Sequence, residues 1–381
     1  MKNFGMYIHI PFCKQKCFYC DFASVKSSKD DSLLYKQYIE ALCQEIVLYR
    51  ELFPDICLDT IYFGGGTPSI LSADLIKKVL ETVSENFKFN SNCEITLEAN
   101  PGTVDGEKLN SLKQNGINRL SFGVQAVQDE LLKKIGRIHT IEEADLAIDL
   151  AKKAGFNNIS VDLMYGLPSQ TLEMLEQSVQ WAVHKDIQHI SIYGLQIEDG
   201  TVFGNLYDKG KLILPAEEDT EMMYDYLTQN LPKYGYRRYE ISNFAIPNFE
   251  SKHNLSYWQD KPYLGLGAGA HGYYGDKRVQ NPFDIKMYIN KCNQKIFPYE
   301  AEENVDKKAH MEEFCFLALR TIWGINKQKF KDTFNEDIHK IYKNIILKLI
   351  KKGLLKETDE AIYLTSKGMK FGNIVFSEFL L

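Results

Sequence analysis

The feature that most constrains the fold is a regular alternation of apolar runs and amphipathic stretches through the first half of the chain. Amphipathic stretches such as 73–85 and 140–154 have helical spacing. The short apolar runs between such stretches have the length and composition of strands, at residues 6–10, 60–63, 94–98, 119–123, 159–164 and 189–193. This alternation predicts an α/β fold, with a parallel sheet and helices outside. Six such units predict an open or partial (β/α)6 barrel instead of a closed eight-stranded one.

Polar and glycine-rich residues recur where these strands end. The second strand runs into Gly-Gly-Gly-Thr-Pro at residues 64–68, and Glu98, Gln125 and Asp162 stand at the ends of later strands. Glycine and proline simply end strands in many proteins, but that reading leaves the three polar residues unexplained. Ligand sites of parallel barrels lie at the carboxyl ends of the strands. The sequence therefore predicts a ligand site along this edge.

Beyond about residue 200 the alternation is lost. The pattern there predicts helices at 217–234, 307–321 and 338–352, and short strands at 236–241, 355–357 and 362–364. We therefore expect three parts: a partial barrel over residues 1–200, a small α+β extension over 201–300, and a winged-helix-like module over 301–381. Many winged helices bind nucleic acid, but this module has no evident basic recognition face, which favours a structural or lid role.

Composition narrows the class of protein. The net charge of −6 gives no electrostatic reason to expect nucleic acid as a partner. The N-terminus lacks the pattern of a signal peptide, and no apolar stretch is long enough to span a bilayer, so we expect a cytoplasmic protein. A disulfide framework is not expected in a cytoplasmic protein. Five scattered cysteines are expected to be small buried residues: Cys43, Cys57, Cys93, Cys292 and Cys315.

The other three cysteines, Cys13, Cys17 and Cys20, crowd into one short segment after the first strand. Closely spaced thiolates are the soft ligands that an iron–sulfur cluster requires, and three of them leave one iron of a 4Fe–4S cube open. A structural zinc site is the main alternative, with His9 as a fourth ligand. Zinc sites usually pair two C-x2-C arms, however, and only one arm is present. A redox dithiol, which needs two cysteines, is a weaker alternative.

This C-x3-C-x2-C loop resembles the signature of the radical S-adenosylmethionine (SAM) superfamily. Further runs resemble its oxygen-independent coproporphyrinogen oxidase branch, over nearly the entire chain. They are YIHIPF at 7–12, GGGTPS at 64–69, EANPG at 98–102, GVQ at 123–125 and DLMYGLP at 162–168. The resemblance implies a partial radical SAM barrel, a 4Fe–4S cluster on the three cysteines, and SAM bound to the open iron.

Within that branch the sequence resembles the HemW family of haem chaperones. Coproporphyrinogen dehydrogenases carry a further cysteine where this chain has Phe22, and a longer N-terminal extension. The chain also contains the H-N-x-x-Y-W motif of the haem chaperones, from His253 to Trp258. A radical SAM oxidase acting on coproporphyrinogen III is the alternative. Whether the protein is an enzyme stays open. A zinc-stabilised nucleic-acid module is a third possibility, which the acidic balance disfavours.

The resemblance also implies which residues contact SAM: Tyr7, Tyr19, Gly65, Gly66, Thr67, Glu98, Gln125, Arg137 and Asp162. Backbone without bulky side chains can approach the methionyl part closely. Glu98 is expected to accept hydrogen bonds from SAM, and Arg137 suits a carboxylate. Two structural alternatives remain: Arg137 as a surface ion pair, and Asp162 as a capping or barrel residue.

For haem, the resemblance implies His253 as the axial ligand, with Tyr257 and Trp258 offering flat surface to a porphyrin. A histidine packed in the core is the alternative, and His271 is a second candidate ligand. The expected partners are haem as cargo and an acceptor haem protein such as a respiratory cytochrome. No nucleic acid and no transmembrane segment are expected, while peripheral contact with a membrane-bound partner stays open.

Overall fold

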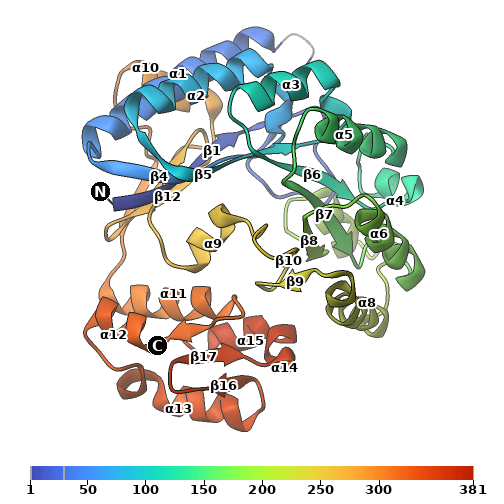
Figure 1. Ribbon diagram of the computed structural model, residues 1–381, viewed down its shortest axis with the longest axis vertical. Helices are drawn as coiled ribbons and strands as arrows, with labels where there is room; N and C mark the ends of the chain where they lie inside the picture. Colours follow the sequence, from blue (N-terminus) through green and yellow to red (C-terminus); the bar gives the residue numbers. More distant parts are fainter. Residues whose placement is uncertain (1, 29–30, 381) are drawn as a thin grey trace.

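The computed structural model describes residues 2–28 and 31–380. Within them, one twelve-stranded sheet runs in the order β14-β13-β12-β11-β1-β4-β5-β6-β7-β8-β10-β9. Figure 1 shows helices along the outer side of this sheet and a separate C-terminal group of helices and short strands on its other side. The two edge strands of the described sheet do not pair with each other, so the sheet is open.

The middle of the sheet is parallel, as the sequence predicts. Its strands are β1 (Lys2–Ile10), β4 (Ile56–Gly65), β5 (Lys88–Ala99), β6 (Arg119–Gln125), β7 (Ile159–Tyr165) and β8 (His189–Gly194), adjacent in this order. The helices between them are α1 (Ser32–Leu52), α2 (Ala73–Asn86), α3 (Gly106–Gln114), α4 (Asp129–Lys134), α5 (Ile141–Lys153) and α6 (Leu172–His184). The predicted α/β class is therefore confirmed.

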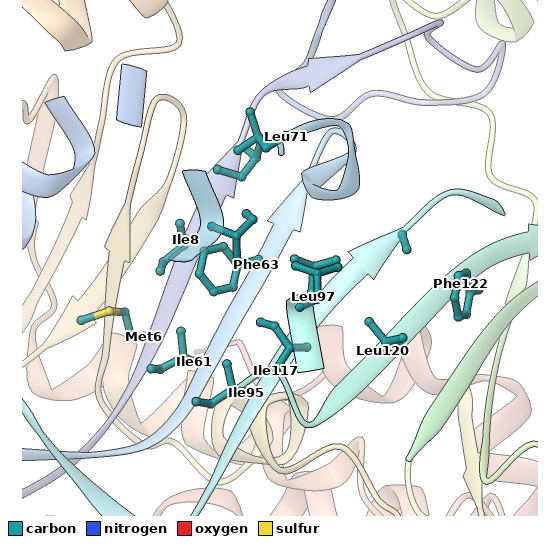
Figure 2. Packing of buried hydrophobic residues seen from close by; sticks show 14 of the residues in the cluster. Met6, Ile8, Ile61, Phe63, Leu71, Ile95, Leu97, Ile117, Leu120 and Phe122 are labelled. Carbon is teal, nitrogen blue, oxygen red and sulfur yellow. The ribbon is translucent and has the colours of Figure 1, made fainter. Parts of the chain in front are cut away.

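Apolar and polar side chains alternate along these strands. Figure 2 shows part of the apolar set packed together in one buried core: Met6, Ile8, Ile61, Phe63, Ile95, Leu97, Leu120 and Phe122. Successive side chains of a strand point to opposite faces of the sheet. The residues between the apolar ones, among them Tyr62, Glu98, Ser121 and Asp162, therefore face the side away from α1 and α2. The sheet thus separates an apolar layer from a polar one.

The region after β8 extends the same sheet at both edges. At one edge, β11 (Tyr263–Leu266) pairs parallel with β1, and β12 (His271–Tyr274), β13 (Lys277–Gln280) and β14 (Ala301–Asn304) follow antiparallel. At the other edge, β10 (Asn243–Ala245) pairs antiparallel with β8 and with β9 (Arg237–Arg238). Of the single strand predicted at 236–241, only residues 237–238 form a strand, β9, because the chain turns before β10 begins at residue 243.

Four helices belong to this region: α7 (Val202–Asp208), α8 (Glu217–Asn230), α9 (Lys252–Trp258) and α10 (Ile285–Asn293). Helix α10 packs beside α1, whereas Figure 1 places α9 on the opposite, polar side of the sheet. The segment that carries the H-N-x-x-Y-W motif therefore covers the polar layer.

The C-terminal module has its own apolar core. Its elements are α11 (Lys307–Leu319), β15 (Ile325–Asn326), α12 (Lys327–Phe334), α13 (Ile338–Lys351), β16 (Leu355–Glu357), β17 (Ala361–Leu364), α14 (Ser366–Lys370) and α15 (Gly372–Ser377). The strands form a small sheet in the order β15-β17-β16. Between the module and the large sheet, the Ile322 amide donates to the carbonyl of Tyr239 (3.2 Å), and Glu240 bridges to Thr321. None of the helices described in the structure is long and apolar enough to cross a membrane.

Candidate functional site

The cysteine loop follows β1 and is fixed to its surroundings by backbone contacts. Two short strands, β2 (Phe12–Cys13) and β3 (Val25–Lys26), close its base. At its middle, the Phe18 amide donates to the carbonyl of Ile135 (3.0 Å), and the Gln15 side chain donates to the carbonyl of Gly136 (3.1 Å). The loop is therefore tied to the turn after α4 as well as to β1.

The three cysteines line one cavity of about 530 Å³ at the carboxyl ends of the parallel strands. Most of the residues predicted from the sequence line it too: Cys13, Cys17, Tyr19, Cys20, Gly65, Gly66, Thr67, Glu98, Gln125, Arg137 and Asp162. They come from the cysteine loop, from the ends of β4 to β7 and from the turn after α4. The site expected at this edge thus corresponds to a real cavity.

Close packing explains the glycine run at the end of β4. The Gly66 amide donates to the carbonyl of Ile10, and the Thr67 amide donates to that of Phe12; both hydrogen bonds are 2.8 Å long. A Cβ atom on Gly66 would lie 2.7 Å from the carbonyl oxygen of Phe12 and 2.9 Å from that of Ile10. Both neighbours are backbone and cannot swing away. A glycine at position 66 therefore allows β4 to approach the cysteine loop.

Buried acids face the cavity. The Tyr62 hydroxyl donates to Glu98 (2.7 Å), and Ser121 donates to Asp162 (3.3 Å). Burial raises the pKa of Glu98 to about 7, against the lowering effect of the Tyr62 hydrogen bond. Burial also raises the pKa of Asp162, while the nearby charge of Arg119 lowers it. Arg119 is itself almost fully buried and supplies a compensating positive charge behind the two acids.

A chain of hydrogen bonds connects Arg137 to the first cysteine. Arg137 donates to the side-chain oxygen of Asn100 (2.7 Å), Asn100 donates to Thr67 (3.1 Å), and the Thr67 hydroxyl lies 3.5 Å from the sulfur of Cys13. Arg137 is thus oriented by an amide, instead of by a surface carboxylate. Asn100 was not singled out from the sequence, although it follows Glu98 in the same EANPG run.

Gln125 has an unusual backbone conformation. Its φ is 73°, and the register of β6 against β7 shifts between Gly123 and Gln125. A non-glycine residue in the left-handed region costs free energy that the surrounding structure must offset, and such positions cluster at ligand sites. A Cβ atom on Gly123 would lie 2.8 Å from the guanidinium of Arg137. The absence of a side chain at Gly123 therefore makes room for Arg137, and the bulge turns Gln125 toward the cavity.

The cysteine thiols fit a cluster better than a single metal ion. No three His, Cys, Asp or Glu side chains within residues 2–28 and 31–380 lie close enough to hold one ion. A 4Fe–4S cluster distributes its thiolates over separate irons, so its ligands stand farther apart than those of one zinc ion. Burial raises the pKa of the Cys20 thiol to about 11 and also that of Cys13, so binding of iron has to displace their protons.

His253 does not line the cavity. Its side chain is 1% exposed, its Nδ1 lies 2.7 Å from the Thr60 hydroxyl and its Nε2 lies 2.7 Å from the Tyr257 hydroxyl. The ring stacks on Tyr62, with centroids 4.9 Å apart. Burial lowers the pKa of His253 to about 3, so the imidazole is neutral. Both ring nitrogens are engaged within the protein, whereas His271, the second candidate, is exposed at the start of β12.

Tyr7 also lies outside the residues that line the cavity. Its ring lies beside the stacked pair of Tyr62 and His253, with centroids 6.2 and 6.4 Å away, and its hydroxyl lies 2.9 Å from Nδ1 of His9. The aromatic layer formed by Tyr7, Tyr62 and His253 therefore lies beneath the acids of the cavity and supports them through the bond from Tyr62 to Glu98.

Other lining residues come from outside the predicted set, among them Tyr193, Glu198, Ser242 and Arg320. The first three belong to the end of β8 or to the segments between β8 and β10, whereas Arg320 follows α11 in the C-terminal module. The sequence contains no motif that marks Arg320, because its position depends on how the module packs against the sheet.

Two family models match the chain: the Radical SAM superfamily over residues 7–182 and the HemN C-terminal domain over residues 305–371. Curated relatives include the "Heme chaperone HemW" of Bacillus subtilis (strain 168), 42% identical over 98% of both chains. That of Lactococcus lactis subsp. lactis (strain IL1403) is 41% identical over 98% of this chain and 97% of its own. The solved coproporphyrinogen III oxidase (HemN) of Escherichia coli, a radical SAM enzyme, has a TM-score of 0.87, 23% identity, and coverage of 100% and 90% of the two chains. That likeness establishes the α/β radical SAM fold. By its full-length similarity to these relatives, the chain belongs to the HemW family of the radical SAM superfamily.

Proposed function

We propose that this protein is a haem chaperone, which binds haem together with a SAM-ligated 4Fe–4S cluster and passes the haem to an acceptor protein. The observation that carries the proposal is 42% identity, over 98% of both chains, to a relative whose name is that of a haem chaperone. Membership of the radical SAM superfamily implies the cluster and SAM. The cavity described above supports a place for both.

In this proposal Cys13, Cys17 and Cys20 hold three irons, and SAM binds the fourth. When bound, the cluster supplies the electron that can cleave SAM. The glycine backbone at 65 and 66 lets the methionyl part approach, and Thr67 orients that edge through Asn100. Neutral or ionised, Glu98 can accept hydrogen bonds from SAM.

The remaining predicted contacts divide between the two sides of the cavity. Arg137, oriented by Asn100, offers its guanidinium to a carboxylate. Gln125 and Asp162 offer amide and carboxyl groups to SAM, and the backbone of Tyr19 meets the adenine. Tyr7 contributes from behind, by fixing the aromatic layer, since it does not line the cavity.

For haem we propose His253 as the axial ligand, which requires that its Nε2 be released from its present partner. Iron must replace the Tyr257 hydroxyl at Nε2. Helix α9 therefore has to shift when haem binds, and the bond from Nδ1 to Thr60 then fixes the ring.

We also propose the division into a partial barrel (1–200), an extension (201–300) and a winged-helix-like module (301–381). The proposed acceptor is a haem protein such as a respiratory cytochrome. We propose a cytoplasmic location for the chaperone and no nucleic acid among its partners. Free thiols at Cys13, Cys17 and Cys20 suit a reducing compartment.

The test is an anaerobic titration of haem into cluster-loaded protein, followed by the Soret absorbance. The proposal predicts saturation at one haem per chain. His253→Ala is expected to weaken binding about tenfold or more and to change the Soret maximum, because the axial ligand is lost. Absence of saturable binding to the wild type, or decarboxylation of coproporphyrinogen III by it, would overturn the chaperone assignment.

Tyr257→Phe is the matched variant, because it frees Nε2 of His253 while keeping the aromatic ring. If His253 binds haem iron, this variant should bind haem at least as tightly as the wild type. If His253 only packs in the core, both variants should lower the melting temperature and neither should alter the Soret maximum. That second pattern would remove His253 as the ligand.

A further inference from the structure

One cationic side chain that lines the cavity, Arg320, comes from the C-terminal module. Lys16, Arg137 and Arg320 are the cationic side chains that line it among the described residues. Lys16 donates to the carbonyl of Phe22 and Arg137 donates to Asn100, so both belong to the cysteine side. Arg320 instead follows α11 and lines the cavity together with Ser242 and Tyr193.

Two neighbours hold the guanidinium of Arg320 in place. Its carbon lies 4.3 Å from the ring centroid of Trp258, the last residue of the H-N-x-x-Y-W motif. Its Nη2 lies 3.5 Å from Oε2 of Glu240, an ion-pair distance too long for a strong hydrogen bond. Stacking on an aromatic face orients a guanidinium without consuming its N–H donors. Apart from the Nη2 group near Glu240, the donors of Arg320 therefore stay available.

Buried polar atoms without partners gather around this point. Within the described part of the chain, Nε of Arg320, Oε2 of Glu240 and Nε1 of Trp258 are buried and have no hydrogen-bond partner. Glu240 is fully buried, and its other oxygen already accepts from Ser242 and Asn243. Buried polar groups in native proteins are nearly always paired, so such a cluster indicates a missing polar ligand or water.

The attachment of the module keeps this arrangement rigid. The Ile322 amide donates to the carbonyl of Tyr239, and Thr321 bridges to Glu240. Arg320 thus immediately precedes a backbone connection to the large sheet. A side chain fixed on both sides in this way is pre-organised for binding, which reduces the entropy lost when a ligand arrives.

We propose that Arg320 receives a carboxylate of the cargo, in the form of a propionate of the porphyrin. This inference rests on the proposed haem-carrier function and names the chemical group of the haem that the carrier recognises. A guanidinium binds a carboxylate through two parallel N–H donors. Glu240 shares the charge of Arg320 but is not among the residues that line the cavity. The acids that do line it, Glu98, Asp162 and Glu198, disfavour an anion beside them, so Arg320 also sets the orientation of the macrocycle.

The experiment compares haem with its propionate dimethyl ester, using cluster-loaded wild type and Arg320→Gln. We expect the variant to bind haem about 10- to 100-fold more weakly, the usual effect of losing a charge-assisted hydrogen bond. The ester, which has no carboxylate charge, should bind the wild type and the variant with equal affinity. Equal affinity of both proteins for haem, or an equal loss with haem and ester, would overturn the inference.

Two control measurements accompany this comparison. Lys370→Gln removes contacts between the module and α8 outside the cavity, and it should leave haem affinity unchanged. The carboxylate of SAM is the other anion available, so SAM binding to Arg320→Gln is measured too. Loss of SAM affinity with normal haem affinity would reassign the carboxylate to SAM. A wild type that binds neither haem nor the ester would defeat the haem-carrier function itself.

Discussion

Gly66 shows how a single residue serves two segments at once. Gly66→Ala places a Cβ atom against the carbonyls of Phe12 and Ile10, which are backbone on both sides. We expect this change to push the cysteine loop away from β4, to lower SAM affinity by about tenfold or more and to lower the melting temperature. Equilibrium binding of SAM to the cluster-loaded protein measures the effect.

The matched control is Gly106→Ala, at the start of α3. A Cβ atom there meets only Leu150, at an ordinary 3.5 Å. This variant should bind SAM like the wild type. An unchanged SAM affinity in Gly66→Ala would mean that the close approach of β4 to the loop does not matter for the site.

Glu45 of α1 gives a pH-dependent prediction. It is fully buried, and it accepts from Tyr288 (2.6 Å), Asn281 (2.7 Å) and the Gly267 amide (2.8 Å). Burial nevertheless raises the pKa of Glu45 to about 7, above its value of about 4.3 in an unfolded chain. The folded state therefore binds this proton more tightly, and the resulting stability is lost as the pH rises from about 4 through 7.

The expected loss in the free energy of unfolding is about 3 kcal/mol for this group. Glu45→Gln has no proton to release, so the difference between wild type and variant should fall by that amount between about pH 4 and pH 8. Denaturant unfolding of the cluster-free protein measures it, with exposed Glu40→Gln as the control. A difference that does not depend on pH would contradict the assigned pKa.

Among single residues, the sequence predicts the site residues that belong to continuous motifs. The three cysteines, the glycines, Glu98 and Asp162 all fall beside a strand end, and the strand ends meet at one edge. Asn100 and Arg320 could not be found in that way, because their roles depend on side-chain contacts across the fold. The burial of His253 was equally invisible, since the motif does not specify which side of α9 faces the sheet.

At the scale of elements, the long parallel strands were the easiest to predict. β5 and β6 are long enough for a continuous run of strand-forming residues to stand out from the flanking helices. The strands β9 to β14 have at most four residues each, too few for a periodic pattern to be recognised. Their pairing is fixed by the edges of a sheet that already exists, so the tertiary structure decides it.

Helix α11 is attached to the turn after α9 by a contact whose strength depends on pH. Nε2 of His310 lies 2.8 Å from Oδ2 of Asp260, and this hydrogen bond raises the pKa of His310 above 6.5, with help from Glu313 and Asp276. For a histidine whose pKa is raised on folding, the stabilisation is fully present below about pH 6.5. It is lost as the pH rises through the folded pKa.

Asp260→Asn removes the partner charge, and asparagine tolerates the positive φ of 56° at this position. We expect the variant to be less stable than the wild type by about 1 kcal/mol at about pH 6, with a smaller difference near pH 9, since the pair is partly exposed. Thermal unfolding at the two pH values measures this, with exposed Asp359→Asn as the control. A larger difference at the higher pH would show that the sign is wrong.

In the whole molecule, segments that are distant in the sequence line a single cavity. The cysteine loop near residue 13, the ends of β4 to β8 and Arg320 of the C-terminal module all line it. The order of strands in the sheet brings the loop and the strand ends together. The module adds the last contribution by docking on the polar side, which no local sequence pattern specifies.

We propose that this cavity binds SAM on an open iron of a cluster held by Cys13, Cys17 and Cys20. The most direct test is electron paramagnetic resonance of the reduced, reconstituted protein with and without SAM. We predict the signal of one 4Fe–4S cluster per chain, a clear shift of that signal on adding SAM, and loss of the cluster in Cys17→Ala but not in Cys93→Ala. A cluster signal that SAM leaves unchanged, or a cluster that survives in Cys17→Ala, would contradict this assignment.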